Sequence, residues 1–96
     1  MKFSQHIVVY ASDEGALLDL VRDDDEGPPP GLLGVRLLRF RDTPGRYVIQ
    51  ADFDSWDSAE ASNDRPDTKA WAARLMGLID GDPKYENLDV LLETTQ

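Results

Sequence analysis

Residues 53–71 read FDSWDSAEASNDRPDTKAW, and this stretch predicts how the second half of the chain folds. An apolar segment gives way to Asp54 or Ser55, either of which can cap a helix by accepting a hydrogen bond from a free backbone N–H. The sequence then breaks at residues 63–66. Pro66 suits the first turn of a new helix, where a missing N–H costs nothing. We therefore expect one capped helix, a break and a restarted helix.

The restarted helix is amphipathic. Asn63 or Asp64 is placed to cap it, and Gly81 and Pro83 are expected to end it. Its apolar residues recur at helical spacing and form one stripe, which we expect to face a sheet. The stripe consists of Trp71, Leu75, Leu78 and Ile79.

Two strands precede this region and are predicted to form a hairpin. They are LLGVRLLRF at residues 32–40 and RYVIQADF at residues 46–53. Between them, Pro44 and Gly45 occupy the second and third positions of a type II turn. Alternation places Tyr47, Ile49, Ala51 and Phe53 on a core face of the second strand. Val48, Gln50 and Asp52 share the other face, which is mixed enough to be a surface or an interface.

The two ends of the chain add two more strands and another helix. QHIVVYA at residues 5–11 is predicted to be a buried strand, and Ser12 is placed to cap a short helix after it. Leu17, Leu20 and Val21 form the apolar side of that helix, which ends in DDDEGPPPG at residues 23–31, a solvated loop. The closing strand is YENLDVLLE, residues 85–93, with Leu88, Val90 and Leu92 on one face.

The order βαββαβ predicts an α+β class, ferredoxin-like sandwich within a single domain, residues 1–96. Two helices would cover one face of a four-stranded antiparallel sheet. The other face would then be open, and a second copy of the chain is the economical cover for it. A homodimer through the open sheet face is therefore expected.

The composition narrows the range of partners. The net charge of −9 argues against nucleic acid and against anionic membranes, so neither is expected as a partner. The charge is uneven, however: residues 32–47 hold four arginines and one aspartate, a local balance of +3. This basic hairpin could receive an anionic ligand or the acidic surface of a second copy, or its arginines could be solvated. No signal peptide or membrane span is visible, and a cytoplasmic location is expected.

The stretch DFDSWDSAEASND, followed by RPDTKAWAARLMGLIDGDP and YENLDVLL, resembles the dimeric α/β-barrel proteins. Within them the chain resembles the antibiotic biosynthesis monooxygenase family and its uncharacterised relatives. The resemblance implies two-fold dimers whose sheets face each other, with a pocket between the sheet and the helices of each subunit. Some members oxidise polyaromatic compounds without metal or cofactor, some degrade heme, and others have no known reaction.

The heme-degrading branch is not expected here. It uses an asparagine on the first strand, where this chain offers Gln5 and His6, and a tryptophan and a histidine on the second long helix. Those two helix positions fall near Ser62 and Ala72, and no histidine follows residue 6. No catalytic residue carries over from that branch, and no cofactor is expected.

Few residues can carry chemistry. His6 is the one histidine and the chain has no cysteine, so a metal site made of several imidazoles or of thiolates is excluded. The nearby acids Asp52 and Asp54 could make a carboxylate site but are expected to be solvated or paired with arginines, and no metal is expected. His6 or Tyr10 could act as a base, although a lone strand histidine is more often simply hydrogen-bonded. Trp56 and Trp71 could line an aromatic pocket with the other site residues expected here, or both could be ordinary core or dimer contacts. The expected pocket residues are Phe53, Trp56, Asn63 and Trp71.

Two functions remain open from the sequence. The first is a cofactor-independent, monooxygenase-like enzyme acting on a small planar or aromatic compound. The second is a non-catalytic dimeric module that binds a small ligand or serves as an accessory protein, because no acid, base and nucleophile converge in the sequence.

Overall fold

The computed structural model describes residues 1–22 and 27–95, which form a four-stranded sheet and three helices. In chain order the elements are β1 Phe3–Tyr10, α1 Glu14–Arg22, β2 Leu32–Arg39, β3 Arg46–Phe53, α2 Trp56–Asn63, α3 Pro66–Met76 and β4 Lys84–Asp89. The acidic residues 23–26, predicted to begin a loop, lie outside the described residues.

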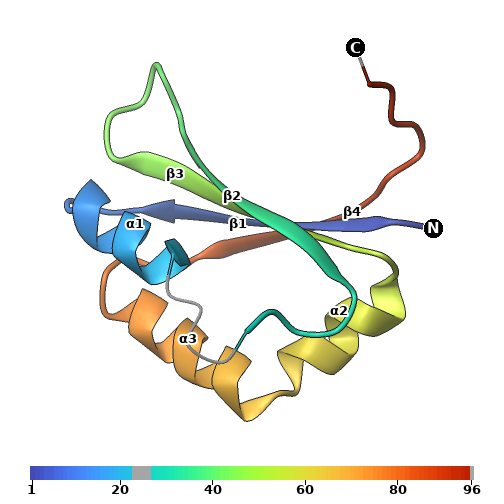
Figure 1. Cartoon of the computed structure of the whole chain (residues 1–96). Coiled ribbons are helices and arrows are strands. Elements are labelled where there is room, and N and C mark those ends of the chain that lie inside the picture. Colours follow the sequence, from blue (N-terminus) through green and yellow to red (C-terminus); the bar gives the residue numbers. More distant parts are fainter. Residues whose placement is uncertain (23–26, 96) are drawn as a thin grey trace.

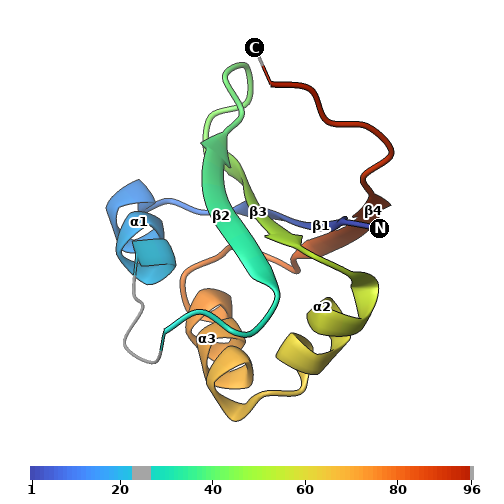
Figure 2. The same cartoon turned by 45° about the vertical axis from the view of Figure 1, so that its right-hand side comes forward.

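The strands lie side by side in the order β2-β3-β1-β4, and each neighbouring pair is antiparallel. The helices lie on one side of the sheet, as two views of the ribbon show (Figures 1 and 2). The predicted ferredoxin-like α+β fold is confirmed. The break at residues 63–66 is confirmed as well, because α2 ends at Asn63 and α3 begins at Pro66.

The hairpin between β2 and β3 forms as predicted. The Arg46 N–H donates to the Thr43 carbonyl over 3.2 Å, which closes a four-residue turn around Pro44 and Gly45. Gly45 has a φ of 81°, the left-handed value that the third position of a type II turn requires. The predicted turn therefore fixes the register of β2 against β3.

The core lies between the sheet and the helices. Its least exposed large side chains come from four elements, each with at most 2% of its surface exposed. They are Val9 of β1, Leu17 and Leu20 of α1, Ile49 of β3 and Leu75 of α3. Trp71, Leu78 and Ile79 pack against this cluster, which confirms the apolar stripe predicted for the restarted helix.

The predicted helix ends need correction at three places. Asp13, not Ser12, accepts a hydrogen bond from a first-turn N–H of α1, that of Ala16, over 3.0 Å. Residue 65 holds the N-cap position of α3 and makes no side-chain cap bond, so neither Asn63 nor Asp64 caps it. A third error concerns the end of α3, which reaches its C-cap at Gly77, before the predicted stop at Gly81 and Pro83.

The closing strand is shorter than predicted, because β4 ends at Asp89. Asp89 pairs with Phe3, the first residue of β1, so β1 has no further residue with which β4 could pair. One further bond follows, from the Val90 N–H to the Lys2 carbonyl over 2.9 Å. Leu88, Val90 and Leu92 therefore do not form the predicted apolar strand face. Val90 and Leu92 follow the end of β4, and Leu92 is 81% exposed.

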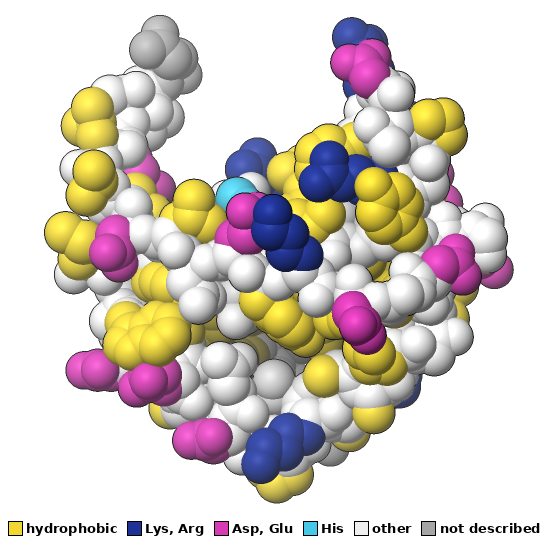
Figure 3. Space-filling model, turned by 180° about the vertical axis from the view of Figure 1, so that it is seen from behind, with side chains coloured by type: hydrophobic (Ala, Val, Ile, Leu, Met, Phe, Trp, Pro, Cys, Tyr) yellow, Lys and Arg dark blue, Asp and Glu magenta, His cyan; other side chains and the backbone are white. Residues whose placement is uncertain are grey.

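The side of the sheet opposite the helices is uncovered. Figure 3 shows the C-terminal segment and the β2–β3 hairpin rising on either side of a hollow in this region. We call this side the open face. None of the helices in residues 1–22 and 27–95 is long and apolar enough to cross a membrane.

Candidate functional site

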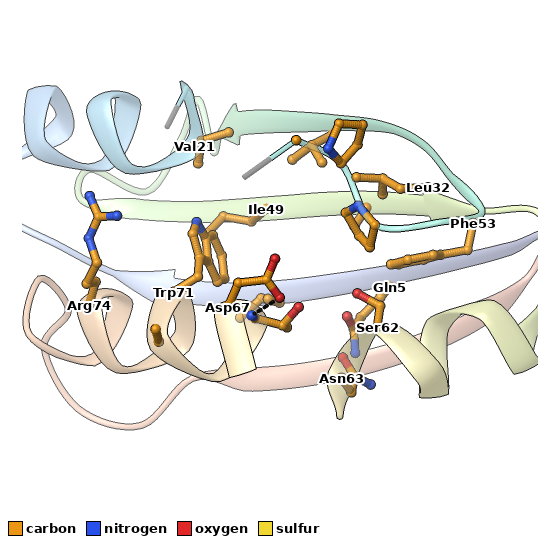
Figure 4. Close-up of a pocket in the computed structure, with 18 of the residues that line it drawn as sticks. Gln5, Val21, Leu32, Ile49, Phe53, Ser62, Asn63, Asp67, Trp71 and Arg74 are labelled. Carbon is orange, nitrogen blue, oxygen red and sulfur yellow. Dashed lines mark hydrogen bonds between the residues drawn. The ribbon is translucent and has the colours of Figure 1, made fainter. Parts of the chain in front are cut away.

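A cavity of about 540 Å³ lies between the sheet and the helices, on the side opposite the open face. Its walls come from β1, β2 and β3, from α1, and from the region where α2 gives way to α3. Figure 4 shows Ile49, Phe53 and Trp71 directed into this space. A cavity of this size holds a small organic molecule of several fused or linked rings.

The walls of the cavity are mainly apolar and aromatic. Phe53 is 4% exposed and Ile49 2% exposed, so these two side chains are held firmly by the core. Leu32 lies on the same side of the sheet, and Trp71 faces the sheet from α3 (Figure 4). Flat apolar walls on two sides favour a planar ligand, because stacked rings bury large areas at fixed spacing.

Trp71 is held in place by a hydrogen bond as well as by packing. Its indole Nε1–H donates to the Leu20 carbonyl at the end of α1, over 3.3 Å. The bond satisfies the one polar group of the side chain and leaves the ring surface to the cavity. Trp71 is therefore a fixed wall, placed by two helices that are distant in sequence.

Gln5 puts a polar group into this apolar cavity. Along β1 the residues on the helix side are Phe3, Gln5, Ile7 and Val9, and all except Gln5 are buried and apolar. Within residues 1–22 and 27–95 the Gln5 side chain has no hydrogen-bond partner. A primary amide offers two donors and an acceptor, so Gln5 can orient a hydroxyl or carbonyl of a ligand.

Gln5 is not among the residues predicted for the pocket, although the sequence carries a signal for it. Strand alternation from Phe3, Ile7 and Val9 places residue 5 on the same face. A polar side chain at the centre of an otherwise apolar strand face is unusual and marks a site to examine.

The helix break contributes a second polar edge to the cavity. Ser62 and Asn63 end α2, and both line the same cavity as Gln5 (Figure 4). The break itself is tied by a bond from the Arg65 N–H to the Ser62 carbonyl over 3.1 Å. The end of α2 thus presents one hydroxyl and one side-chain amide to the cavity.

Asp67 is the acidic side chain among the described residues of the cavity, and it is already engaged. Arg65 binds both of its oxygens, over 2.9 Å and 2.8 Å, and the Thr68 N–H donates to it over 2.9 Å. These bonds, above all those from Arg65, lower the pKa of Asp67 below its usual range. A carboxylate held ionised in this way is a weak base, so it is better suited to fixing the start of α3 than to removing a proton.

The other predicted site residues lie elsewhere. Trp56 is 43% exposed and packs edge-on against Phe3, with ring centroids 4.9 Å apart, outside the cavity lining. His6 and Tyr10 project from β1 on the opposite side of the sheet, toward the open face. The structure therefore brings together Phe53, Asn63 and Trp71 and separates them from the two candidate bases.

Comparison with known proteins supports the fold. No family model matches the chain, and no curated protein sequence matches it significantly. Among solved structures the chain is similar to SnoaB of Streptomyces nogalater, a cofactor-independent oxygenase, with a TM-score of 0.76 and 16% identity over 99% of this chain and 98% of that one. The chain has the fold of this oxygenase.

Two further structures are similar to the same extent. Rv0793 of Mycobacterium tuberculosis has a TM-score of 0.75 and 13% identity, over 99% of this chain and all of that one (100%). A provisionally named antibiotic biosynthesis monooxygenase of Caulobacter crescentus has a TM-score of 0.75 and 22% identity, over 95% of this chain and 91% of that one. At these identities the likeness shows the monooxygenase-type fold, as the resemblance of residues 52–83 and 85–92 predicted.

The described residues offer little to a metal ion. Residues 1–22 and 27–95 contain no group of three or more histidine, cysteine, aspartate or glutamate side chains placed to hold one. The polar groups that reach the cavity are amides, hydroxyls, arginines and one engaged carboxylate. Such a set recognises organic substituents through hydrogen bonds.

Proposed function

We propose that this chain binds a small, planar, largely apolar compound in the cavity, and that it supports a cofactor-independent oxygenation of that compound. The observation that carries the proposal is the cavity itself, with Trp71 and Phe53 as aromatic walls and the Gln5 amide between them. Ring faces would hold the ligand, and amide groups would fix its orientation. The fold shared with a protein named as a cofactor-independent oxygenase supports the same chemistry.

In the proposed reaction the substrate itself supplies the reactive group and the electrons. A methylene group flanked by aromatic rings is converted to a carbonyl, with one atom of O₂ entering the product and the other leaving as water with the two methylene hydrogens. The substrate supplies the electrons. Because Asp67 is engaged and His6 and Tyr10 lie on the other side of the sheet, the substrate must be acidic enough to ionise without a strong base. The protein then orients its anion and excludes competing reactions.

Binding without turnover is the second candidate function. It is favoured by the same observation that limits the first, namely that the described cavity residues do not include a free acid–base group near Gln5. In that case the chain is a small-ligand-binding or accessory module.

Anthrone is a suitable probe, because it is planar and carries an oxidisable methylene group. Its binding can be followed by tryptophan fluorescence, and its oxidation by an oxygen electrode and by the absorbance of anthraquinone. Trp71→Ala is expected to weaken binding about tenfold or more, since a stacking wall is lost. Trp56→Ala is the matched control, because Trp56 lies outside the cavity lining, and it should leave binding unchanged.

The outcomes separate the two candidates. Binding with oxygen uptake that is lost in Trp71→Ala supports the oxygenase, and binding without uptake supports the module. Equal effects of the two tryptophan changes, or no binding of anthrone or related planar compounds, would reject the cavity as the site.

We propose in addition that the chain acts as a homodimer through the open face. The support is physical: large apolar side chains lie on that side without cover, among them Leu38, 38% exposed, and Tyr10, 49% exposed. Analytical ultracentrifugation over a dilution series tests this directly. A monomer at every concentration would reject it.

A further inference from the structure

The open face is organised in three rows that run across the strands. Directly paired residues on neighbouring strands project to the same side, so the register gives each row. From β2 to β4 the central row is Arg36, Gln50, His6 and Glu86. The rows on either side are Leu38, Val48, Val8 and Lys84, and Gly34, Asp52, Ser4 and Leu88.

The central row has a direction, because its two ends carry opposite charges. Arg36 lies on the edge strand β2, and Glu86 lies on the other edge strand, β4. Gln50 and His6 lie between them, and the Arg36 guanidinium donates to the Gln50 Oε1 over 2.8 Å. Figure 3 shows the single histidine near the floor of the hollow, beside basic and acidic side chains. The row thus runs from positive to negative across the sheet.

A row with this direction discriminates between the two ways in which a sheet can face a copy of itself. A two-fold axis across the strands would place Arg36 opposite Arg36 of the partner subunit, and Glu86 opposite the partner's Glu86. A two-fold axis parallel to the strands, between β1 and β3, would place Arg36 opposite the partner's Glu86. Like charges in close contact cost free energy and opposite charges do not, so the second arrangement is favoured.

The neighbouring rows favour the same arrangement. With the axis parallel to the strands, each row faces its own reversed copy, so Val48 lies against the partner's Val8 and Gly34 leaves room for the partner's Leu88. With the axis across the strands, the row of Leu38 and Val48 would face the row of Gly34 and Asp52. That arrangement would set apolar side chains against a carboxylate.

We infer that two copies pack with their open faces together about a two-fold axis parallel to the strands, so that Arg36 of each copy pairs with Glu86 of the partner subunit. This rests on the homodimer proposed above but not on the cavity. Facing sheets lie about 10 Å apart and cross at about 30°, which moves the row ends by only a few ångströms. Arginine and glutamate side chains are long enough to meet across that distance.

Charge reversal tests the pairing. Arg36→Glu and Glu86→Arg each place two like-charged pairs in the dimer, so each is expected to raise the dimer dissociation constant about tenfold or more at low salt, and less at high salt. An equimolar mixture of the two variants contains a heterodimer in which both pairs have opposite charges. Its affinity should return to nearly that of the unaltered chain.

The variants and the control distinguish loss of the Arg36–Glu86 pair from an effect of net charge and from unfolding. Arg36→Glu makes the net charge of −9 more negative and Glu86→Arg makes it less negative, so an effect of net charge would differ in sign between them. Lys69→Glu, on the exposed side of α3, is the matched control and should leave the dimer unchanged. Circular dichroism verifies that each variant is folded.

Each outcome of this experiment decides a different point. An unaltered chain that stays monomeric rejects the homodimer, and the inference with it. A dimer that neither reversal weakens is formed through another surface or about an axis across the strands, and either result rejects the pairing. Reversals that weaken the dimer without rescue in the mixture show that Arg36 does not pair with Glu86 of the partner subunit. Anthrone binding is measured separately, so the proposed cavity function stands or falls independently.

Discussion

The two faces of the sheet use the same four strands for different purposes. On the helix side of β1, Phe3, Ile7 and Val9 are buried, and Gln5 interrupts them. On the open side, His6 and its neighbours form a polar row, and the row beside it that contains Leu38, Val48 and Val8 is mainly apolar. In each case the exception is informative: a polar group among buried apolar ones indicates a ligand, and apolar groups on an uncovered face indicate a partner.

The largest expected contrast is in stability, between the core on the helix side of the sheet and the C-terminal segment beside the open face. Leu75 is 1% exposed within the core below the sheet, so Leu75→Ala should lower the free energy of unfolding by about 2–5 kcal/mol. Leu91, 84% exposed on the C-terminal segment, is the matched control, and the same change there should stay within about 0.5 kcal/mol. Urea unfolding measures both. Equal losses would mean that the C-terminal segment is packed as tightly as the core.

Much of the helix side could be predicted because its signals are local. Pro44 and Gly45 specify a turn, alternation in residues 46–53 specifies the core face of β3, and Pro66 specifies a helix start. Each of these signals lies within a few residues of its effect. The same holds for Phe53 and Trp71 in the cavity, since each lies on the apolar side of an element with a clear period.

The errors arise where the answer depends on distant residues or on a close competition. Ser12 and Asp13 are both good N-cap residues. Because α1 begins at Glu14, the N-cap position falls on Asp13, and its side chain accepts from the Ala16 N–H. The length of β4 is set by where β1 begins, far away in the sequence. Trp56 leaves the cavity because it finds Phe3, a contact across more than half of the chain that no period reveals.

A smaller contrast separates two glycines with left-handed backbones. Gly31 and Gly81 have φ values of 85° and 78°, so alanine is strained at both. A Cβ at residue 31 would also lie 2.5 Å from the Cβ of Ser58 in α2, whereas a Cβ at residue 81 would meet nothing within 4 Å. Gly31→Ala should therefore cost about 1–3 kcal/mol more than Gly81→Ala in urea unfolding. Equal costs would show that α2 shifts freely over the sheet edge.

The smallest expected effect is a pH dependence on the helix side. Arg65 lowers the pKa of Asp67 in the folded chain, so the unfolded chain binds more protons at that carboxyl as the pH falls. The stabilisation is therefore full above about pH 4, the ordinary range of aspartate, and is lost as the pH falls through the lowered pKa. Asp67→Asn should flatten the acid side of the stability curve, measured as urea midpoints from neutral pH downwards. A variant that follows the unaltered curve at every pH would show that the Arg65 pair does not hold the start of α3, and Asp67 would then be open to a role in the cavity.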